Sequence, residues 1–169
     1  MTADEGDIRF DFSRAISWKR LDEKDHGLSH CMKAVDFIVG LPERIHFIEV
    51  KDPEDPSAEN AESFLERFKT EKYIKDVLVQ KCRDSFLYEY GYNNISKSVH
   101  YSVVVCISTL SEPLLLAITE ILKHNIPITG PKKRPWPKRF IENCMVFSLE
   151  TWNKHMPDFH VTRISSSDI

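Results

Sequence analysis

Three ionisable side chains, Asp36, Glu49 and Lys51, occupy positions that two neighbouring strands could bring together. Residues 33–39 (KAVDFIV) and 45–51 (IHFIEVK) are rich in β-forming residues, and a Gly-Leu-Pro-Glu turn separates them. A connection this short predicts an antiparallel pair. Side chains alternate along a strand, so Glu49 and Lys51 share one face, and Asp36 can lie beside them. The spacing therefore predicts a cluster of two carboxylates and one amine.

Such a cluster is suited to metal-assisted hydrolysis of a phosphate ester. Mg²⁺ prefers oxygen ligands, keeps several waters and completes its shell with phosphate oxygens. The neighbouring ammonium can orient a water or stabilise charge that develops on a phosphate. Asp is depleted in strands, and Asp36 stands in the apolar run 35–39, so its carboxylate needs a partner or a metal ion. An ion pair with Lys51 alone would also meet that need.

This arrangement resembles the active site of the PD-(D/E)xK nuclease superfamily, which includes restriction endonucleases, Holliday-junction resolvases and RecB-type exonucleases. The resemblance covers about residues 11–108 and implies a restriction-endonuclease-like core in the order helix, three strands, helix, strand. It implies that Asp36, Glu49 and Lys51 are catalytic, with Asp36 and Glu49 holding Mg²⁺, for which Mn²⁺ can substitute. The carbonyl of Val50 would be a further ligand, and Lys51 would assist the attacking water. The implied reaction is hydrolysis of phosphodiester bonds in nucleic acid, with DNA favoured over RNA.

The resemblance rests on context more than on the letters of the motif. An acid-x-Lys triplet occurs at 22–24 as well as at 49–51, but only the second ends an apolar strand. Val35 stands where the superfamily often has proline. Many members add an acid from their first helix, and Glu23 matches it by position as a further metal ligand; the alternative is a surface glutamate.

Two other interpretations of the whole chain stay open. In one, a nuclease-like fold has lost catalytic activity and acts as a nucleic-acid-binding or protein-interaction module. In the other, the fold is unrelated, and the hairpin carries charged groups on a solvated face.

A second candidate contact with nucleic acid is the sequence KKRPWPKR at residues 132–139, called the basic loop below. Cations release counterions from phosphates, and an exposed indole can stack on an unpaired base. The alternative is a proline-stiffened surface loop whose tryptophan packs into the core. The residues concerned are Lys132, Lys133, Arg134, Trp136, Lys138 and Arg139.

The remaining pattern predicts a single α/β domain over 1–169, in which helices flank a mixed central sheet. Apolar spacing and capping residues predict helices over 11–25, 58–90 and 111–125. The β-branched run 99–108 predicts a buried central strand, and 144–149 a final short strand. The core would span about 11–108, followed by a helix, the basic loop and a strand within about 111–150.

The composition is that of an ordinary soluble globular protein: 41% of the 169 residues are hydrophobic, 29% are charged, and the net charge is −3. Apolar runs are too short for a membrane span, and the first twenty residues lack the apolar middle of a signal peptide. Four well-separated cysteines predict reduced, mostly buried thiols and a cytoplasmic protein. Motifs for nucleotide binding and serine hydrolysis are absent from the sequence. A homodimer or a larger complex is compatible with this chain.

Overall fold

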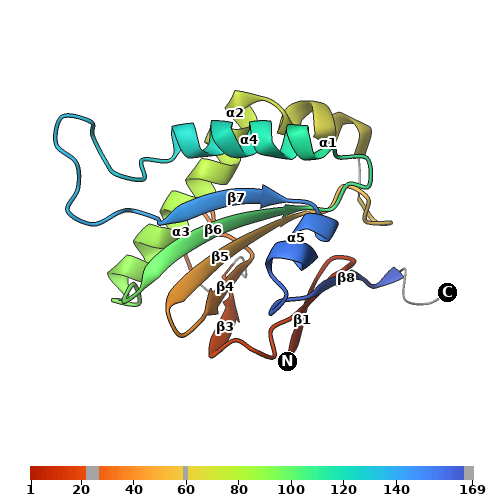
Figure 1. Cartoon of the computed structure of the whole chain (residues 1–169), viewed down its shortest axis with the longest axis horizontal. Coiled ribbons are helices and arrows are strands. Elements are labelled where there is room, and N and C mark those ends of the chain that lie inside the picture. Colours follow the sequence, from red (N-terminus) through yellow and green to blue (C-terminus); the bar gives the residue numbers. More distant parts are fainter. Residues whose placement is uncertain (22–26, 59–60, 166–169) are drawn as a thin grey trace.

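The structure is a computed structural model that describes residues 1–21, 27–58 and 61–165 and shows a mixed α/β fold with two sheets (Figure 1). The larger sheet contains β3 (Ser17–Arg20), β4 (Phe37–Gly40), β5 (Arg44–Lys51), β6 (Ser98–Val105) and β7 (Asn143–Phe147). The smaller sheet contains β1 (Thr2–Glu5), β2 (Ile8–Asp11) and β8 (Val161–Arg163). The helices are α1 (Ala61–Phe68), α2 (Glu71–Tyr73), the π-helix η2 (Ile74–Val79), α3 (Gln80–Gly91), α4 (Glu112–Asn125) and α5 (Leu149–His155). The predicted α/β class is confirmed.

The larger sheet has the order β3-β4-β5-β6-β7. β4 is antiparallel to both of its neighbours, β3 and β5, whereas β5, β6 and β7 are parallel to one another. In the predicted hairpin, Phe37 pairs with Ile48 and Gly40 with Ile45, so the antiparallel pairing is confirmed. Parallel neighbours need a long crossover connection, which the helices between β5 and β6 provide.

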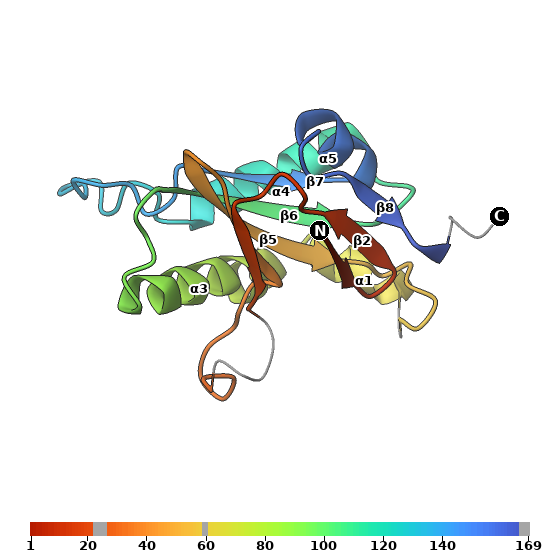
Figure 2. The same ribbon diagram turned by 90° about the horizontal axis from the view of Figure 1, so that it is seen from below.

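Two hydrophobic cores lie on opposite faces of this sheet because its side chains alternate. On one face, residues such as Phe47 pack against η2, α3 and α4. On the other face, Ile48 and Val50 pack against the smaller sheet and α5, around Phe10 and Trp152. Figures 1 and 2 show α3 and α5 on opposite sides of the sheet. Side-chain direction along β5 thus decides which layer each residue meets.

The predicted helix over 11–25 is wrong for the part that the structure describes. β2 ends at Asp11 and β3 covers Ser17–Arg20, whose pairing with β4 adds a strand to the hairpin. The supposed helical stripe fails because Ile16 is 64% exposed, whereas Phe10 and Phe12 are buried at the two-residue spacing of a strand. Residues 22–26 lie outside the described ranges.

The predicted helix over 58–90 is divided. α1 ends at Phe68, and Thr70 starts α2 by accepting a hydrogen bond from Tyr73 N. A π-helical segment then leads into α3. The strand predicted from residue 33 begins only at Phe37, because Lys33 N and Val35 N donate to Asp84 and Ser85 of α3 instead of to a neighbouring strand. The predictions missed β1, β2, β3, α5 and β8.

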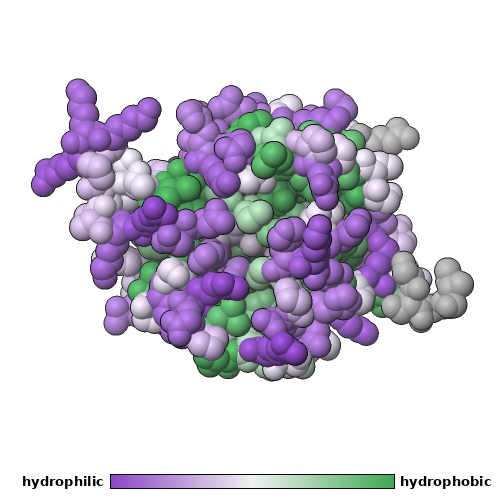
Figure 3. Space-filling model, viewed as in Figure 1, coloured by the Kyte–Doolittle hydropathy of each residue, from purple (hydrophilic) through white to green (hydrophobic). Residues whose placement is uncertain are grey.

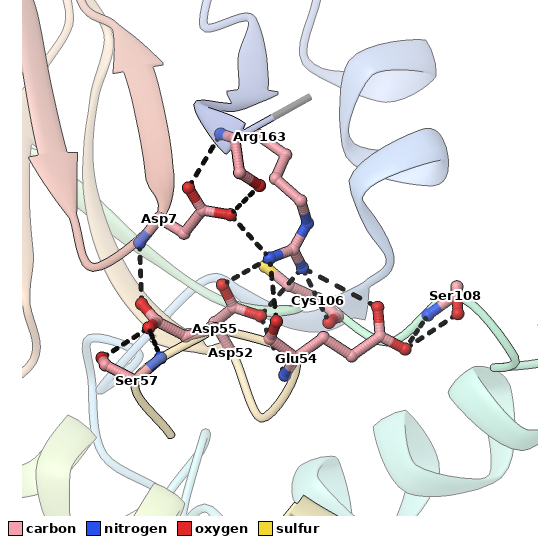
Figure 4. Close-up of polar contacts among 9 residues, drawn as sticks. Asp7, Asp52, Glu54, Asp55, Ser57, Cys106, Ser108 and Arg163 are labelled. Atoms are coloured by element: carbon pink, nitrogen blue, oxygen red, sulfur yellow. Dashed lines mark hydrogen bonds and ion pairs between the residues drawn. The ribbon is translucent and has the colours of Figure 1, made fainter. Parts of the chain in front are cut away.

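The loop after β5 is tied to the smaller sheet by Arg163 (Figure 4). Its guanidinium binds both carboxylate oxygens of Asp52, at 2.9 and 3.0 Å, and also Asp7 at 3.1 Å. Two parallel bonds from one guanidinium fix both position and orientation. Asp55 adds a link by accepting from Asp7 N. The residues that directly follow Lys51 are therefore held in place.

The states of the four cysteines and the character of the helices bear on two further predictions. Cys31, Cys82, Cys106 and Cys144 are free thiols, and all but Cys31 are buried, as predicted. Among the described residues, no helix has the length and apolar character needed to cross a bilayer.

Candidate functional site: a buried carboxylate–lysine cluster

The structure brings Asp36, Glu49 and Lys51 together and adds Lys81, and these four residues are called the carboxylate–lysine cluster below. Glu49 is fully buried and Asp36 nearly so. Glu49 Oε1 lies 2.5 Å from Lys51 Nζ and 2.9 Å from Lys81 Nζ. Lys81 Nζ also lies 3.5 Å from Asp36 Oδ1. Two carboxylates and two ammonium groups thus lie close together on the face of the sheet that η2, α3 and α4 cover.

The hairpin register places the two carboxylates side by side. Phe37 pairs with Ile48, so the residues immediately beyond this pair are Asp36 and Glu49. Asp36 Oδ2 accepts a hydrogen bond from Val50 N, with 2.6 Å between the two atoms. The side chain of Val50 points into the opposite core, as alternation requires. Asp36 is therefore oriented by the backbone of the strand that carries Glu49.

Lys81 enters the cluster from the start of α3, and the sequence interpretation missed it. It lies three residues after Leu78 and four before Ser85, both buried, so it belongs to the buried face of the helix. The side chain of Ser85 also holds Val35 N, which anchors α3 against the residues that precede Asp36. A lysine on the apolar stripe of a helix is the sequence signal that could have revealed it.

Burial controls the protonation of the cluster. It raises the pKa of Glu49 to about 7, and the charge of Asp36 adds to this rise, while Lys51 and Lys81 act against it. Burial acts to lower the pKa of Lys51, but the charges of Glu49 and Asp36 outweigh it, and that pKa lies above its usual value. The pKa of Lys81 is raised for the same reasons. Both lysines therefore stay charged at neutral pH, whereas Glu49 titrates there.

The carboxylate oxygens of Asp36 and Glu49 are ligands of the kind that Mg²⁺ prefers, but the cluster offers few of them. Glu49 Oε2 is buried and makes no hydrogen bond to any described residue. Within the described ranges, no group of three or more Asp, Glu, His or Cys side chains is arranged to hold a metal ion. Asp36 and Glu49 could hold a divalent ion that keeps most of its ligands as water, as Mg²⁺ commonly does. Such an ion would compete with the ammonium of Lys81, which now contacts both carboxylates.

Val50 and Glu23 are the other two predicted metal ligands. The backbone N–H of Val50 is used by Asp36, and the role of its carbonyl as a ligand stays a prediction. Glu23 lies in the segment outside the described residues, so its position relative to the cluster is not described.

The basic loop does not lie beside the carboxylate–lysine cluster. It precedes β7, and Glu142 N just after it donates to Val99 O at the beginning of β6. In Figure 1 it projects beyond the left ends of β6 and β7, whose arrowheads point right. Glu49 and Lys51 lie at the opposite end of the parallel strands. The eight residues of β5 separate the two ends by roughly 23 Å at the usual rise per residue.

The predicted nucleic-acid residues of the basic loop are all exposed, and Trp136 is 46% exposed. Trp136 is therefore only partly packed, with its ring 6.4 Å from that of Phe140. Hydrophilic side chains project where this loop lies, on the left of the space-filling view (Figure 3).

Comparison with known proteins found no match to a family model, a curated protein or a solved structure. The chemistry of the cluster and the surface around the basic loop are therefore the grounds for a functional proposal.

Proposed function

We propose that the protein is a Mg²⁺-dependent phosphodiesterase that cleaves nucleic acid, with DNA favoured, at the carboxylate–lysine cluster. The observation that carries this proposal is the complete burial of Glu49 beside a second carboxylate, Asp36. Removing a carboxylate from water costs several kcal/mol, and well-packed apolar residues often replace buried ion pairs without loss of stability. Strongly perturbed, clustered ionisable groups are typical of functional sites.

The order of the elements supports the same proposal. Strands β3, β4 and β5 form an antiparallel meander, the helices α1 to α3 follow, and β6 returns parallel to β5. This agrees with the order of three strands, helix and strand that the PD-(D/E)xK resemblance implies. Glu49 and Lys51 end the third strand of that meander. The opening helix of the expected core has no counterpart in residues 11–21.

The residues of the cluster would divide the work by charge and position. Asp36 and Glu49 would hold the ion, with the Val50 carbonyl as a further ligand. When bound, Mg²⁺ would lower the pKa of a water and offset the charge of the phosphate. Lys51, whose side chain is 20% exposed, would orient the attacking water and stabilise negative charge that develops on the phosphate. Lys81 balances the carboxylates in the ion-free protein.

One observation favours a second function, that of a nuclease-like fold without cleavage that binds nucleic acid or a protein. Lys81 Nζ contacts both carboxylates and thereby supplies the positive charge that a bridging ion would supply. If this lysine stayed in place with substrate bound, the cluster would be a closed ion-pair network of two carboxylates and two amines.

Calorimetric titration with Mn²⁺ and Mg²⁺ separates the two functions. The proposed enzyme binds the ion as wild type, and Asp36→Asn abolishes the binding, whereas Lys19→Met, which removes the lysine paired with Glu89, does not. For the second function, wild type binds no ion, and only Lys81→Met opens a site. Ion binding by Lys81→Met but not by wild type would therefore contradict the proposed enzyme.

A further inference from the structure

A groove of about 1000 Å³ lies between the basic loop, the end of α3 and the beginning of β6. Four aromatic side chains line it, Phe86 and Tyr90 from α3 and Trp136 and Phe140 from the other side. It is far larger than one side chain could fill. Of its four aromatic side chains, Phe86 and Phe140 pack against a hydrophobic core, whereas Tyr90 and Trp136 belong to neither core.

The four rings form a continuous series. Tyr90 lies nearly parallel to Phe86, with ring centroids 6.3 Å apart, and Phe86 is 4.4 Å from Phe140. Trp136 follows at 6.4 Å from Phe140. The two outer rings are exposed, Tyr90 at 67% and Trp136 at 46%. Each contacts one of the two inner rings, Tyr90 that of Phe86 and Trp136 that of Phe140. Exposed rings held at fixed positions are suited to stacking with flat ligands.

Gly130 holds the indole of Trp136 in place. Its φ is +77°, a conformation that favours glycine, and an added Cβ would lie 2.5 Å from the indole ring. The indole ring therefore packs closely against the backbone at a position that only glycine can occupy. Trp136 N also donates to Thr129 O, which closes the loop at its base. The ring is thus preset for binding, which reduces the entropy lost when a ligand stacks on it.

Positive charge surrounds these rings. Lys97, Lys138 and Arg139 line the groove, and the basic loop that forms one side of it also carries the exposed Lys132, Lys133 and Arg134. Among the described residues, the one acidic side chain that lines it, Glu142, pairs with Arg139 at 2.9 Å. Aromatic rings with cations around them complement a polyanion whose bases are unpaired, because a duplex hides the faces of its bases within its own stack.

From these contacts we infer that the groove binds a single-stranded segment of nucleic acid, with bases stacked on Trp136 and Tyr90 and phosphates against the surrounding cations. This inference deepens the proposed function and rests on it for the class of substrate. Helix α3 joins the two sites: Lys81 touches Glu49, and Tyr90 lies nine residues further on, about 14 Å along the helix axis. A substrate with an unpaired tail could engage the groove while its scissile bond lies at the cluster.

Fluorescence anisotropy in metal-free buffer with EDTA tests this inference without any cleavage. The probes are a labelled single-stranded oligodeoxynucleotide of about 16 nucleotides and its duplex. Wild type should bind the single strand more tightly. Tyr90→Ala and Trp136→Ala should each weaken that binding by roughly 5- to 150-fold, the usual range for loss of one stacked base.

Two variants control for side-chain removal and for folding. Tyr92 is as exposed as Tyr90, at 67%, and lies two residues further along the chain but outside the groove, so Tyr92→Ala should bind like wild type. Trp136→Phe keeps an aromatic ring against Gly130, so it should bind the single strand with an affinity closer to that of wild type than to that of Trp136→Ala. Equal binding of single strand and duplex, or equal losses in Tyr90→Ala and Tyr92→Ala, would overturn the inference.

The outcomes for the two sites are distinguishable because binding is measured without metal. Single-strand binding that depends on Trp136 would support the groove even if no substrate were ever cut, and only the proposed enzyme would then fail. Cleavage that depends on Glu49, in a protein whose Trp136→Ala variant binds single strands normally, would support the enzyme and overturn the groove.

Discussion

At the scale of single residues, Glu49 dominates the chemistry because it is excluded from water. Burial raises its pKa to about 7, and the neighbouring charge of Asp36 raises it further. The folded-state pKa lies above the ordinary value of 4.5, so the native protein binds this proton more tightly than the unfolded chain does. Between these two values a rise in pH therefore reduces the contribution of Glu49 to stability. The carboxylate gains its charge only near neutrality.

The proposed cleavage should accelerate as pH rises through about 7, because Glu49 must lose its proton before its oxygens can hold a cation. Lys81→Met removes a charge that lowers the pKa of Glu49, so its pH–rate profile should move to higher pH. Lys19→Met, which changes the partner of another buried glutamate, Glu89, should leave the profile unchanged. A Lys81→Met profile displaced to lower pH would contradict this account of the charges.

At the scale of elements, α3 sets the geometry of both candidate sites. Its first turn carries Lys81 to the carboxylates, and its last two turns present Phe86 and Tyr90 to the groove. The π-helical segment before it adds a residue to a turn and so alters which side chains face the sheet. Lys81 nevertheless follows Leu78 by three residues, so its place on the buried face of the helix was within reach of an argument from spacing.

The exposed cations of the basic loop should act on nucleic acid through counterion release. Lys138→Ala is expected to weaken binding for all sequences and to reduce the slope of log K against log salt by about 1. Lys154→Ala removes an equally exposed lysine from α5, away from the groove, and should change that slope little. Filter-binding or anisotropy titrations over a series of salt concentrations measure both. Equal slopes of log K against log salt for the two variants would show that Lys138 of the basic loop does not contact phosphates.

At the scale of the whole molecule, the two ends of the chain close the second layer over the sheet. β2, which pairs with β1 near the N-terminus, also pairs with β8 near the C-terminus, and Arg163 links this layer to the loop that follows Lys51. Asp52 is buried enough that its pKa is raised despite this guanidinium. Loss of Arg163 would leave that carboxylate buried without its bidentate partner, directly next to the proposed site.

Arg163→Met should therefore lower the free energy of unfolding by about 3 kcal/mol, the usual cost of breaking a largely buried ion pair. Arg14→Met provides the matched control, because Arg14 also pairs with a carboxylate, that of Asp158, but its side chain is 73% exposed. Its loss should cost less than about 1 kcal/mol. Urea titrations followed by circular dichroism measure both. Equal costs would show that the Arg163 network does not bear on stability.

The features that could be predicted were those formed by residues close together in the sequence. The hairpin that carries Asp36, Glu49 and Lys51 could be predicted because strand alternation and a short turn are encoded within 20 consecutive residues. β1, β2 and β8 could not, since each strand has only three or four residues and the pairing of β2 with β8 joins segments from opposite ends of the chain. The distance between the basic loop and the carboxylates was also hidden, because it depends on the direction of the parallel strands.

In the proposed enzyme, Glu49 serves phosphodiester cleavage and not merely folding. The most direct measurement is Mg²⁺-dependent cleavage of linear, circular and single-stranded DNA by wild type, Glu49→Gln and Glu89→Gln. Both glutamates are buried and paired with lysine, but only Glu49 lies in the carboxylate–lysine cluster. Wild type and Glu89→Gln should cleave DNA, whereas a folded Glu49→Gln should not. Equal cleavage by all three proteins would contradict this role of Glu49.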